Sequence, residues 1–179
     1  MRQLIFCVLC LTATSVSASL IGDEVTLEYF FPDRSTIFES HTTVVTTDGS
    51  DVVILFDLQP MTSIDMNANG FSLASLFDET FFWESEFNGF VISGLDWAGQ
   101  PREIVGLAIL TDLPGWDDNF ASFSSDSVAI NFASLAGPTI LPFNMQVEFQ
   151  TVAVVPLPTA VWLFGSALGL LGWLQRSKA

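Results

Sequence analysis

The sequence predicts an all-β protein, an antiparallel β-sandwich of jelly-roll-like type, followed by a single C-terminal transmembrane helix. Two observations favour the sandwich. Short segments alternate apolar and polar residues, and turn residues separate them at intervals of about 8–15 residues. Eight or nine such segments fit between residues 19 and 152. The helix is indicated by an uncharged stretch of 16 residues, Thr159–Leu174, that is followed closely by basic residues.

The first half of this region contains the clearest alternation. Residues Glu24–Phe30 have the period of a half-buried strand, with three apolar side chains on one face: Val25, Leu27 and Tyr29. Segment 36–47 is rich in Thr and Val, and segment 51–58 is strongly apolar. The tight-turn sequence Asp48-Gly49-Ser50-Asp51 lies between these two segments. We therefore expect them to form a β-hairpin.

The second half is less regular. Segment 63–67 is a weaker strand that ends at Asn69-Gly70. Segment 71–83 fits either a short helix, because three of its apolar residues have helical spacing, or an aromatic loop. Further strands are expected at 87–95, 104–110, 122–135 and 145–151, with a loop at 113–118.

Residues 1–18 have the three parts of a secretory signal peptide. Met1-Arg2-Gln3 gives a basic start, residues 4–11 are apolar, and Val16-Ser17-Ala18 places small residues at the −3 and −1 positions. The apolar run is far shorter than the ~20 residues that a membrane span needs. We therefore expect cleavage between Ala18 and Ser19.

Residues 19–152, called the body below, carry a strongly negative charge. All 20 acidic residues lie there with only Arg34 and Arg102 as cations, which gives a formal charge of −18. Such a surface repels the phosphates of nucleic acid, so no nucleic-acid partner is expected. Both cysteines, Cys7 and Cys10, lie in the signal peptide. The body therefore has no disulfide, and its stability must come from burial of apolar surface.

Residues 153–179 are expected to hold a membrane helix at about 157–174. Trp162 and Trp173 lie near its two ends, where interfacial indoles are common. Arg176 and Lys178 follow, and the positive-inside rule places this tail in the cytoplasm and the body outside. The predicted location is the inner membrane, with a single pass. Two glycines four residues apart would allow close helix contact: Gly165 and Gly169. The alternative is a buried core helix, which needs an apolar surface all round.

The entry to this segment resembles a known sorting tag. Val155-Pro156-Leu157-Pro158-Thr159, followed by a Gly/Leu-rich segment and basic residues, is similar to the VPLPA variant of the PEP-CTERM signal. That signal occurs on exported proteins of Gram-negative bacteria that make exopolysaccharide. The resemblance implies recognition by an exosortase-type membrane enzyme that cuts near the Pro-x-Pro motif. Thr159 replaces the usual Ala, and Ser177 separates the basic residues of the tail.

The body offers little material for catalysis, and we expect no catalytic residue and no cofactor. His41 is the only histidine and lies in a Thr/Val-rich strand, without the partners of a metal site or a triad. Hard-oxygen side chains on two loops are weak calcium candidates, although turn formation explains them equally well: Asp48, Asp51, Asp117 and Asp118.

The sequence therefore predicts an exported structural or interaction protein of the cell envelope or of an exopolysaccharide matrix. One alternative is a carbohydrate-binding module, helped by calcium, that stacks sugars on exposed indoles: Trp83, Trp97 and Trp116. The second alternative is an extracytoplasmic glycoside hydrolase, which requires a cleft with two carboxylates about 5–10 Å apart. Buried indoles and scattered carboxylates would favour the structural protein.

Overall fold

A computed structural model of the chain describes residues 19–49, 51–56, 59–76, 79–97, 101–135, 137–140, 142–153 and 166. The expected signal peptide, the sorting motif and nearly all of the expected membrane helix lie outside these residues. Only Ser166, which is helical, is described in that segment. Within the described ranges, no helix is long and apolar enough to cross a membrane.

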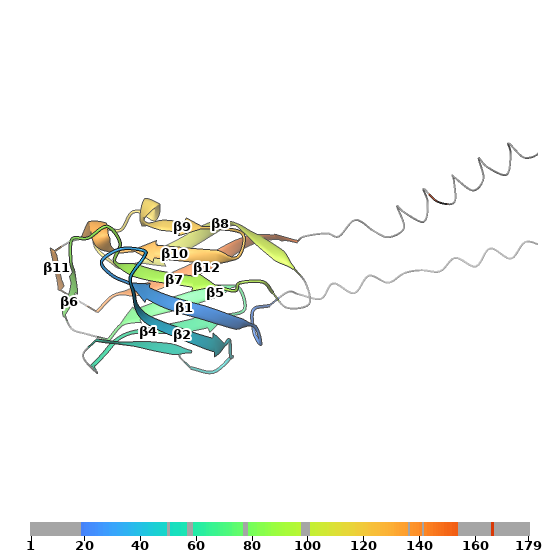
Figure 1. Cartoon of the computed structure of the whole chain (residues 1–179), viewed down its shortest axis with the longest axis horizontal. Coiled ribbons are helices and arrows are strands. Elements are labelled where there is room, and N and C mark those ends of the chain that lie inside the picture. Colours follow the sequence, from blue (N-terminus) through green and yellow to red (C-terminus); the bar gives the residue numbers. More distant parts are fainter. Residues whose placement is uncertain are drawn as a thin grey trace, which may run out of the picture.

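Two five-stranded antiparallel sheets face each other, as Figure 1 shows. The first sheet contains β1 (Glu24–Phe30), β2 (Ile37–Val44), β7 (Gly89–Ser93), β9 (Ala121–Phe123) and β10 (Ser127–Asn131), in the order β2-β1-β7-β10-β9. The second sheet contains β3 (Val52–Phe56), β4 (Gln59–Asn67), β5 (Gly70–Ser75), β8 (Arg102–Thr111) and β12 (Asn144–Ala153), in the order β3-β4-β5-β12-β8.

Smaller elements complete the described fold. Strands β6 (Glu79–Phe82) and β11 (Gly137–Ile140) form a two-stranded sheet at one end of the sandwich (Figure 1). Two 3-10 turns flank β9 and β10: η1 (Asp118–Phe120) and η2 (Ala133–Leu135). The prediction of an all-β sandwich is thus confirmed.

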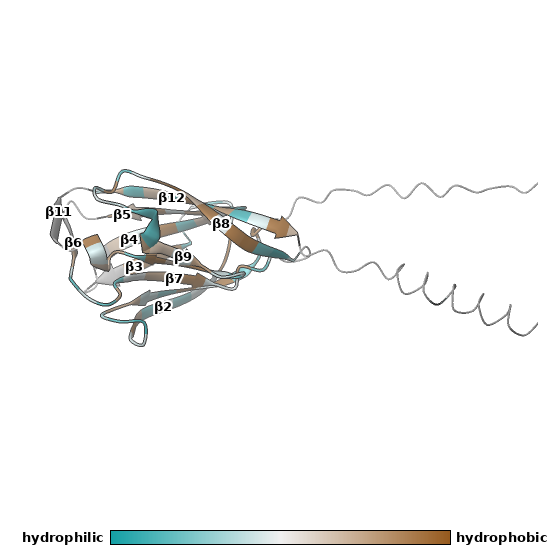
Figure 2. Ribbon diagram, turned by 90° about the horizontal axis from the view of Figure 1, so that it is seen from above, coloured by the Kyte–Doolittle hydropathy of each residue, from teal (hydrophilic) through white to brown (hydrophobic). Residues whose placement is uncertain are grey.

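The core fills the space between the two sheets, because alternate residues of each strand point inward. In β12, Met145, Val147 and Phe149 are buried, and the residues between them are exposed. In β1, Val25 and Leu27 are buried as expected. Figure 2 shows hydrophobic residues along much of β7 and β8, whereas teal hydrophilic residues mark many of the turns.

Aromatic rings dominate one end of this core. The ring of Phe132 stacks on Phe82 with a centroid distance of 4.8 Å, and Phe90 and Phe143 pack against it at 5.9 and 6.0 Å. Trp116 also packs on Phe132, at 6.3 Å. Phe90 belongs to the first sheet, Phe82 belongs to the small sheet, and Phe143 directly precedes β12 of the second sheet. These contacts therefore hold the three sheets together at the end of the sandwich where β6 lies.

The expected hairpin between segments 36–47 and 51–58 is wrong. The turn exists, and Gly49 has a left-handed φ of 88° that suits glycine. However, β2 pairs with β1, whereas β3 pairs with β4 in the other sheet. The turn therefore carries the chain from one sheet to the other. Its sequence indicates a reversal of direction, but it does not say which strands become hydrogen-bonded.

The described residues of segment 71–83 form neither a helix nor an aromatic loop. The segment contains β5 and β6, and β5 alternates like a sheet strand, with Phe71 and Leu73 buried against the core. Leu76, which has helical spacing from Leu73, is instead exposed. Gly70 allows β5 to lie close to β12, because a side chain there would collide with the carbonyl of Val147. The pairing of β5 with β12, which is distant in the sequence, therefore decides the conformation of this segment, and the helical spacing of its apolar residues does not.

The strand order also departs from the jelly-roll-like topology. Strands β3, β4 and β5 pair in sequence as a meander, and β1–β2 and β9–β10 are hairpins, whereas a jelly roll is built from two Greek keys. The strand at 145–151 is confirmed, whereas the segment 122–135, expected as one strand, contains the end of β9, then β10 and η2. The described ranges hold twelve strands, more than the eight or nine expected.

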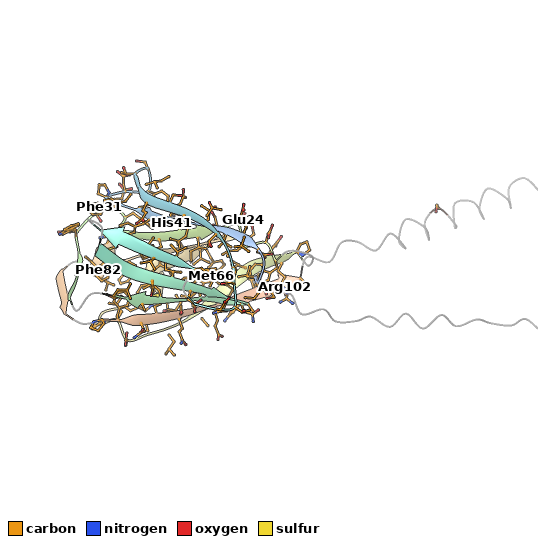
Figure 3. All side chains as sticks on the ribbon, turned by 90° about the horizontal axis from the view of Figure 1, so that it is seen from below. Glu24, Phe31, His41, Met66, Phe82 and Arg102 are labelled. Carbon is orange, nitrogen blue, oxygen red and sulfur yellow. The ribbon has the colours of Figure 1, made fainter. Side chains whose placement is uncertain are left out.

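The start of β1 and the end of β12 lie at the same end of the sandwich (Figure 1). Backbone hydrogen bonds agree with this placement. Leu20 N–H donates to the Ala68 carbonyl and Phe149 N–H donates to the Asn69 carbonyl, at 3.0 and 2.8 Å. Arg102 lies at this end, whereas Phe31 and Phe82 lie at the opposite end (Figure 3). We call these the proximal and distal ends.

We expect Phe132→Ala to lower the free energy of unfolding by about 3–5 kcal/mol, because it removes a fully buried ring and leaves a cavity. Phe123→Ala is the matched control, since that ring is 47% exposed and its loss should cost far less. Chemical denaturation followed by tryptophan fluorescence measures both. Equal losses in the two variants would contradict the central position of Phe132.

Candidate functional site

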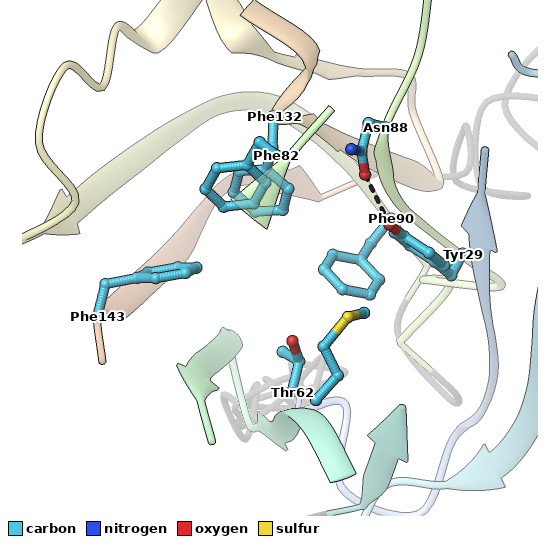
Figure 4. A pocket seen from close by; sticks show the side chains of 8 residues that line it. Tyr29, Thr62, Phe82, Asn88, Phe90, Phe132 and Phe143 are labelled. Atoms are coloured by element: carbon cyan, nitrogen blue, oxygen red, sulfur yellow. Dashed lines mark hydrogen bonds between the residues drawn. The ribbon is translucent and has the colours of Figure 1, made fainter. Parts of the chain in front are cut away.

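The enclosed cavity nearest the aromatic cluster is small. It has a volume of about 30 Å³ and is lined mainly by aromatic rings, together with Met61, Thr62 and Asn88 (Figure 4). Such a space holds about one or two water molecules, whereas ligand pockets usually measure about 300–1,000 Å³. The cavity is therefore a packing feature of the core and has no room for a substrate.

The polar groups around this cavity form hydrogen bonds that connect strands of the first sheet. The Tyr29 hydroxyl donates to Asn88 Oδ1 at 2.6 Å, and the Asn88 backbone N–H donates to Asn131 Oδ1 at 3.1 Å. The Asn88 carbonyl accepts a hydrogen bond from Phe132 N–H at 2.8 Å. Burial raises the pKa of Tyr29 to about 12, so its hydroxyl stays protonated and able to donate at neutral pH. This network links β1, β7 and β10.

Asp51, one of the calcium candidates, has a structural role. Its Oδ1 accepts hydrogen bonds from the backbone N–H and the hydroxyl of Thr46, at 3.2 and 3.1 Å. Its Oδ2 accepts from Met66 N–H at 2.8 Å. Through these hydrogen bonds, Asp51 connects the segment between β2 and β3 to strand β4. Asp48 is exposed on the same turn.

The second calcium candidate pair also serves local structure. Asp117 is the N-cap of η1, and its side chain accepts from Asn119 N–H at 2.8 Å. Asp118 Oδ1 accepts from the indole Nε1 of Trp116 at 3.0 Å. The described residues contain no group of three or more His, Cys, Asp or Glu side chains arranged to hold a metal ion.

His41 lies on β2 beside Glu39, with its Nε2 2.7 Å from Glu39 Oε1. Both side chains are partly exposed on a strand at the edge of the first sheet. This pair of neighbouring polar side chains is of the kind that an outward sheet face commonly carries.

The three indoles of the body are in different environments. Trp97 is 1% exposed and packs edge-on against Phe149 at 6.0 Å, with a left-handed φ of 48°. Trp116 is partly buried against the core. Trp83 is 47% exposed and packs on Phe31 at 5.5 Å, at the distal end. They therefore do not form a co-planar platform for sugars.

The two hollows on the second sheet do not bring a pair of carboxylates together in an enclosed cleft. Two shallow hollows on the second sheet contain one carboxylate each, Asp112 and Glu148. Asp112 binds the backbone of Asn144, and Asn144 lies four residues before Glu148 on β12. At about 3.4 Å per residue, the backbone positions of Asn144 and Glu148 are about 14 Å apart, so the two carboxylates lie beside well-separated points of β12.

Several residues that the sequence singled out lie outside the described residues. These are the cleavage residue Ala18, the motif Val155-Pro156-Leu157-Pro158-Thr159, and the anchor residues Trp162, Gly165, Gly169, Trp173, Arg176 and Lys178. Ser19 is described, and its Oγ accepts a hydrogen bond from Ile21 N–H at 3.1 Å.

Sequence reasoning missed the hollows between β8 and β12. The outward residues of β12 follow from the alternation of segment 145–151, but this alternation does not show which strand lies beside them. The exposed amide of Gln146, which lines both hollows, was the available signal.

Comparisons of this chain with protein-family models, with curated proteins and with solved structures found no match.

Replacing Asp51 with Ala removes the acceptors of three hydrogen bonds. We expect the free energy of unfolding to fall by about 2–4 kcal/mol, because the acceptor is charged. The control Asp48→Ala should change it by less than about 0.5 kcal/mol, since that side chain is exposed. Chemical denaturation with and without calcium chloride measures both. A calcium-dependent stabilisation that Asp51→Ala abolishes would show a metal site instead.

The pKa of Asp65 is raised by burial and, to a lesser degree, by the charge of Asp51. Native Asp65 therefore binds its proton more tightly than the unfolded chain does. Its stabilising contribution is complete below about pH 3.8 and is lost as the pH rises through the native pKa. We expect Asp65→Asn to stabilise the protein at pH 7 by less than about 1 kcal/mol, because the site is partly exposed. The gain should vanish at pH 3.

Asp33→Asn is the matched control, because it removes the same charge. The pKa of Asp33 is lowered by hydrogen bonds from the Ser35 side chain, the Ser35 backbone and Thr36. Its contribution is therefore present above about pH 3.8 and is lost as the pH falls. Asp33→Asn should destabilise the protein at pH 7. Thermal unfolding at pH 3 and pH 7 measures both, and equal shifts would point to net charge alone.

Proposed function

We propose that this chain is an exported structural or interaction protein of the cell envelope or its surrounding matrix, sorted through its C-terminal motif. One observation carries the proposal. The sandwich is completed by β12, which ends at Ala153, and the motif begins two residues later at Val155. A cut at the motif would therefore release the body with its core and both sheets intact.

The position of the two ends of the body supports the same proposal. The start of β1 and the end of β12 share the proximal end (Figure 1). A leader before Ser19 and an anchor after Ala153 would then both approach the membrane from this end. The distal end, with the half-exposed Trp83, would face away from it.

The proposed anchor is a helix at about 157–174 that crosses the inner membrane once. Trp162 and Trp173 would lie at the two interfaces, and Arg176 and Lys178 would stay in the cytoplasm. An exosortase-type enzyme would then recognise the Pro-x-Pro motif and separate the body from the helix. This part of the proposal rests on the sequence and its resemblance to the sorting tag.

The charge of the body suits this role. At a formal −18, it repels anionic polymers and other copies of itself, which keeps a secreted domain soluble and dispersed. The alternative of a sugar platform made of indoles is not favoured, because Trp97 is buried and Trp116 is partly buried.

The double variant Pro156→Ala with Pro158→Ala should insert normally but resist processing, because the recognised motif is lost. Intact mass spectrometry of membrane and extracellular fractions from the native host measures this. The unchanged chain should give a species that starts at Ser19 and ends near residues 156–159, and the double variant should retain Ala179.

The control is Pro114→Ala, in an exposed loop of the body, which should be processed normally. If the double variant is cut like the unchanged chain, the sorting proposal is wrong. If the unchanged chain itself retains Ala179 in the membrane, the segment is a permanent anchor and the likeness to the tag is one of sequence only.

A further inference from the structure

The outer face of the second sheet carries two adjoining hollows between β8 and β12. One has a volume of about 280 Å³ and lies near Asp112 and Asn144, and the other has about 220 Å³ and lies near Ala108 and Glu148. Leu110 and Gln146 line both hollows, so the two are continuous. We call them together the β8–β12 groove. It is larger than the core cavity by far, and it is open to solvent.

Its polar wall comes from the outward residues of β12. Asn144, Gln146 and Glu148 are exposed at alternate positions, while the residues between them point into the core. The backbone of Asn144 is held by Thr111, whose hydroxyl donates to its carbonyl at 2.7 Å, and by Asp112 Oδ1, which accepts from its N–H at 2.7 Å. The wall is thus fixed in place at one end.

The side chains of this wall remain available for a ligand. Among the residues that the structure describes, the side chains of Asn144, Gln146 and Glu148 make no hydrogen bond to protein groups. A carboxamide presents both donors and an acceptor, and a carboxylate presents acceptors only. This combination matches hydroxyl groups, which donate and accept through the same atom.

The opposite wall is apolar. Gln146 lies across from Leu110 and Glu148 lies across from Ala108 in the ladder between the two strands. Leu110 is 72% exposed, the largest exposure among the large hydrophobic side chains of the described residues. Figure 2 shows β8 mostly in the brown of hydrophobic residues. A ligand in the groove would therefore meet hydrogen-bonding groups on one side and aliphatic carbon on the other.

Charge selects among possible ligands. The groove contains two carboxylates, Asp112 and Glu148, and no Lys or Arg lines it. The body as a whole has only Arg34 and Arg102 as cations. Anionic polymers would be repelled here. A neutral chain rich in hydroxyl groups meets no such barrier.

We propose that the β8–β12 groove binds a neutral polysaccharide. Sugar rings carry hydroxyl groups at their edges and C–H groups on their faces, which fit the polar and apolar walls respectively. The wall from Asn144 to Glu148 is about 14 Å long at about 3.4 Å per residue, and the groove is open, so it suits an internal segment of a polymer. This inference stands on the groove alone and does not depend on the sorting motif.

A second copy of the chain fits less well. Part of the β8 edge is already covered, because Ile104 N–H donates to the Ser125 carbonyl at 2.9 Å. Two bodies of charge −18 also repel each other. A peptide strand pairing with β8 would meet the same covered edge.

Affinity electrophoresis of the full chain tests the proposal. Native gels would contain a soluble neutral glucan, galactomannan or xyloglucan, with polygalacturonate as the anionic comparison and a polyoxyethylene detergent that carries no sugar. We expect retardation in at least one neutral polymer and none in polygalacturonate. Gln146→Ala and Leu110→Ser should each weaken the apparent affinity by about threefold to tenfold.

Ile37→Ser is the matched control for Leu110→Ser, since Ile37 is also exposed on an edge strand, but in the first sheet. It should leave the retardation unchanged. The proposal is overturned by mobility that no neutral polymer alters, by stronger retardation in polygalacturonate, or by retardation that neither groove variant weakens. A concentration-dependent dimer that Leu110→Ser dissolves would assign the groove to a second copy of the chain instead.

Discussion

Burial of apolar side chains between two sheets is the interaction on which the rest of this structure depends. The body has no cysteine, so no covalent cross-link stands in for packing. Aromatic rings do much of this work, with Phe132 in contact with Phe82, Phe90 and Phe143. The buried network around Asn88 fits within this packing because its polar groups are hydrogen-bonded, which avoids the cost of desolvated and unpaired groups.

Because the core uses one face of each strand, the other faces are available for surface chemistry. In β12 this division is strict: Met145, Val147 and Phe149 point inward, and the amide and the carboxylate between them point outward. The same strand therefore closes the core, forms one wall of the β8–β12 groove and leads to the proposed sorting motif. Function in such a domain depends on which outward residues neighbouring strands bring together, and that is decided by topology.

Local patterns in the sequence predicted the elements better than their arrangement. Strict alternation identified β1 and β12, because a strand with one buried face must repeat every second residue. The turn at Asp48–Asp51 was recognised, but the hydrogen bonds of Asp51 to Thr46 and Met66 come from a crossing between sheets that no local signal encodes. The groove was missed for the same reason, since the pairing of Gln146 with Leu110 joins residues 36 positions apart.

The pairing of β12 on both sides also determines how the body responds to tension. Residues 144–148 are bonded to β5, and residues 145–153 are bonded to β8. A pull applied at Ala153 acts along the strand, so it loads both ladders in shear, and many hydrogen bonds must break together before the strand slides. A pull across an edge strand would instead break them one after another. A pull along β12 is thus resisted by two ladders at once, whereas an edge strand is held by one ladder only.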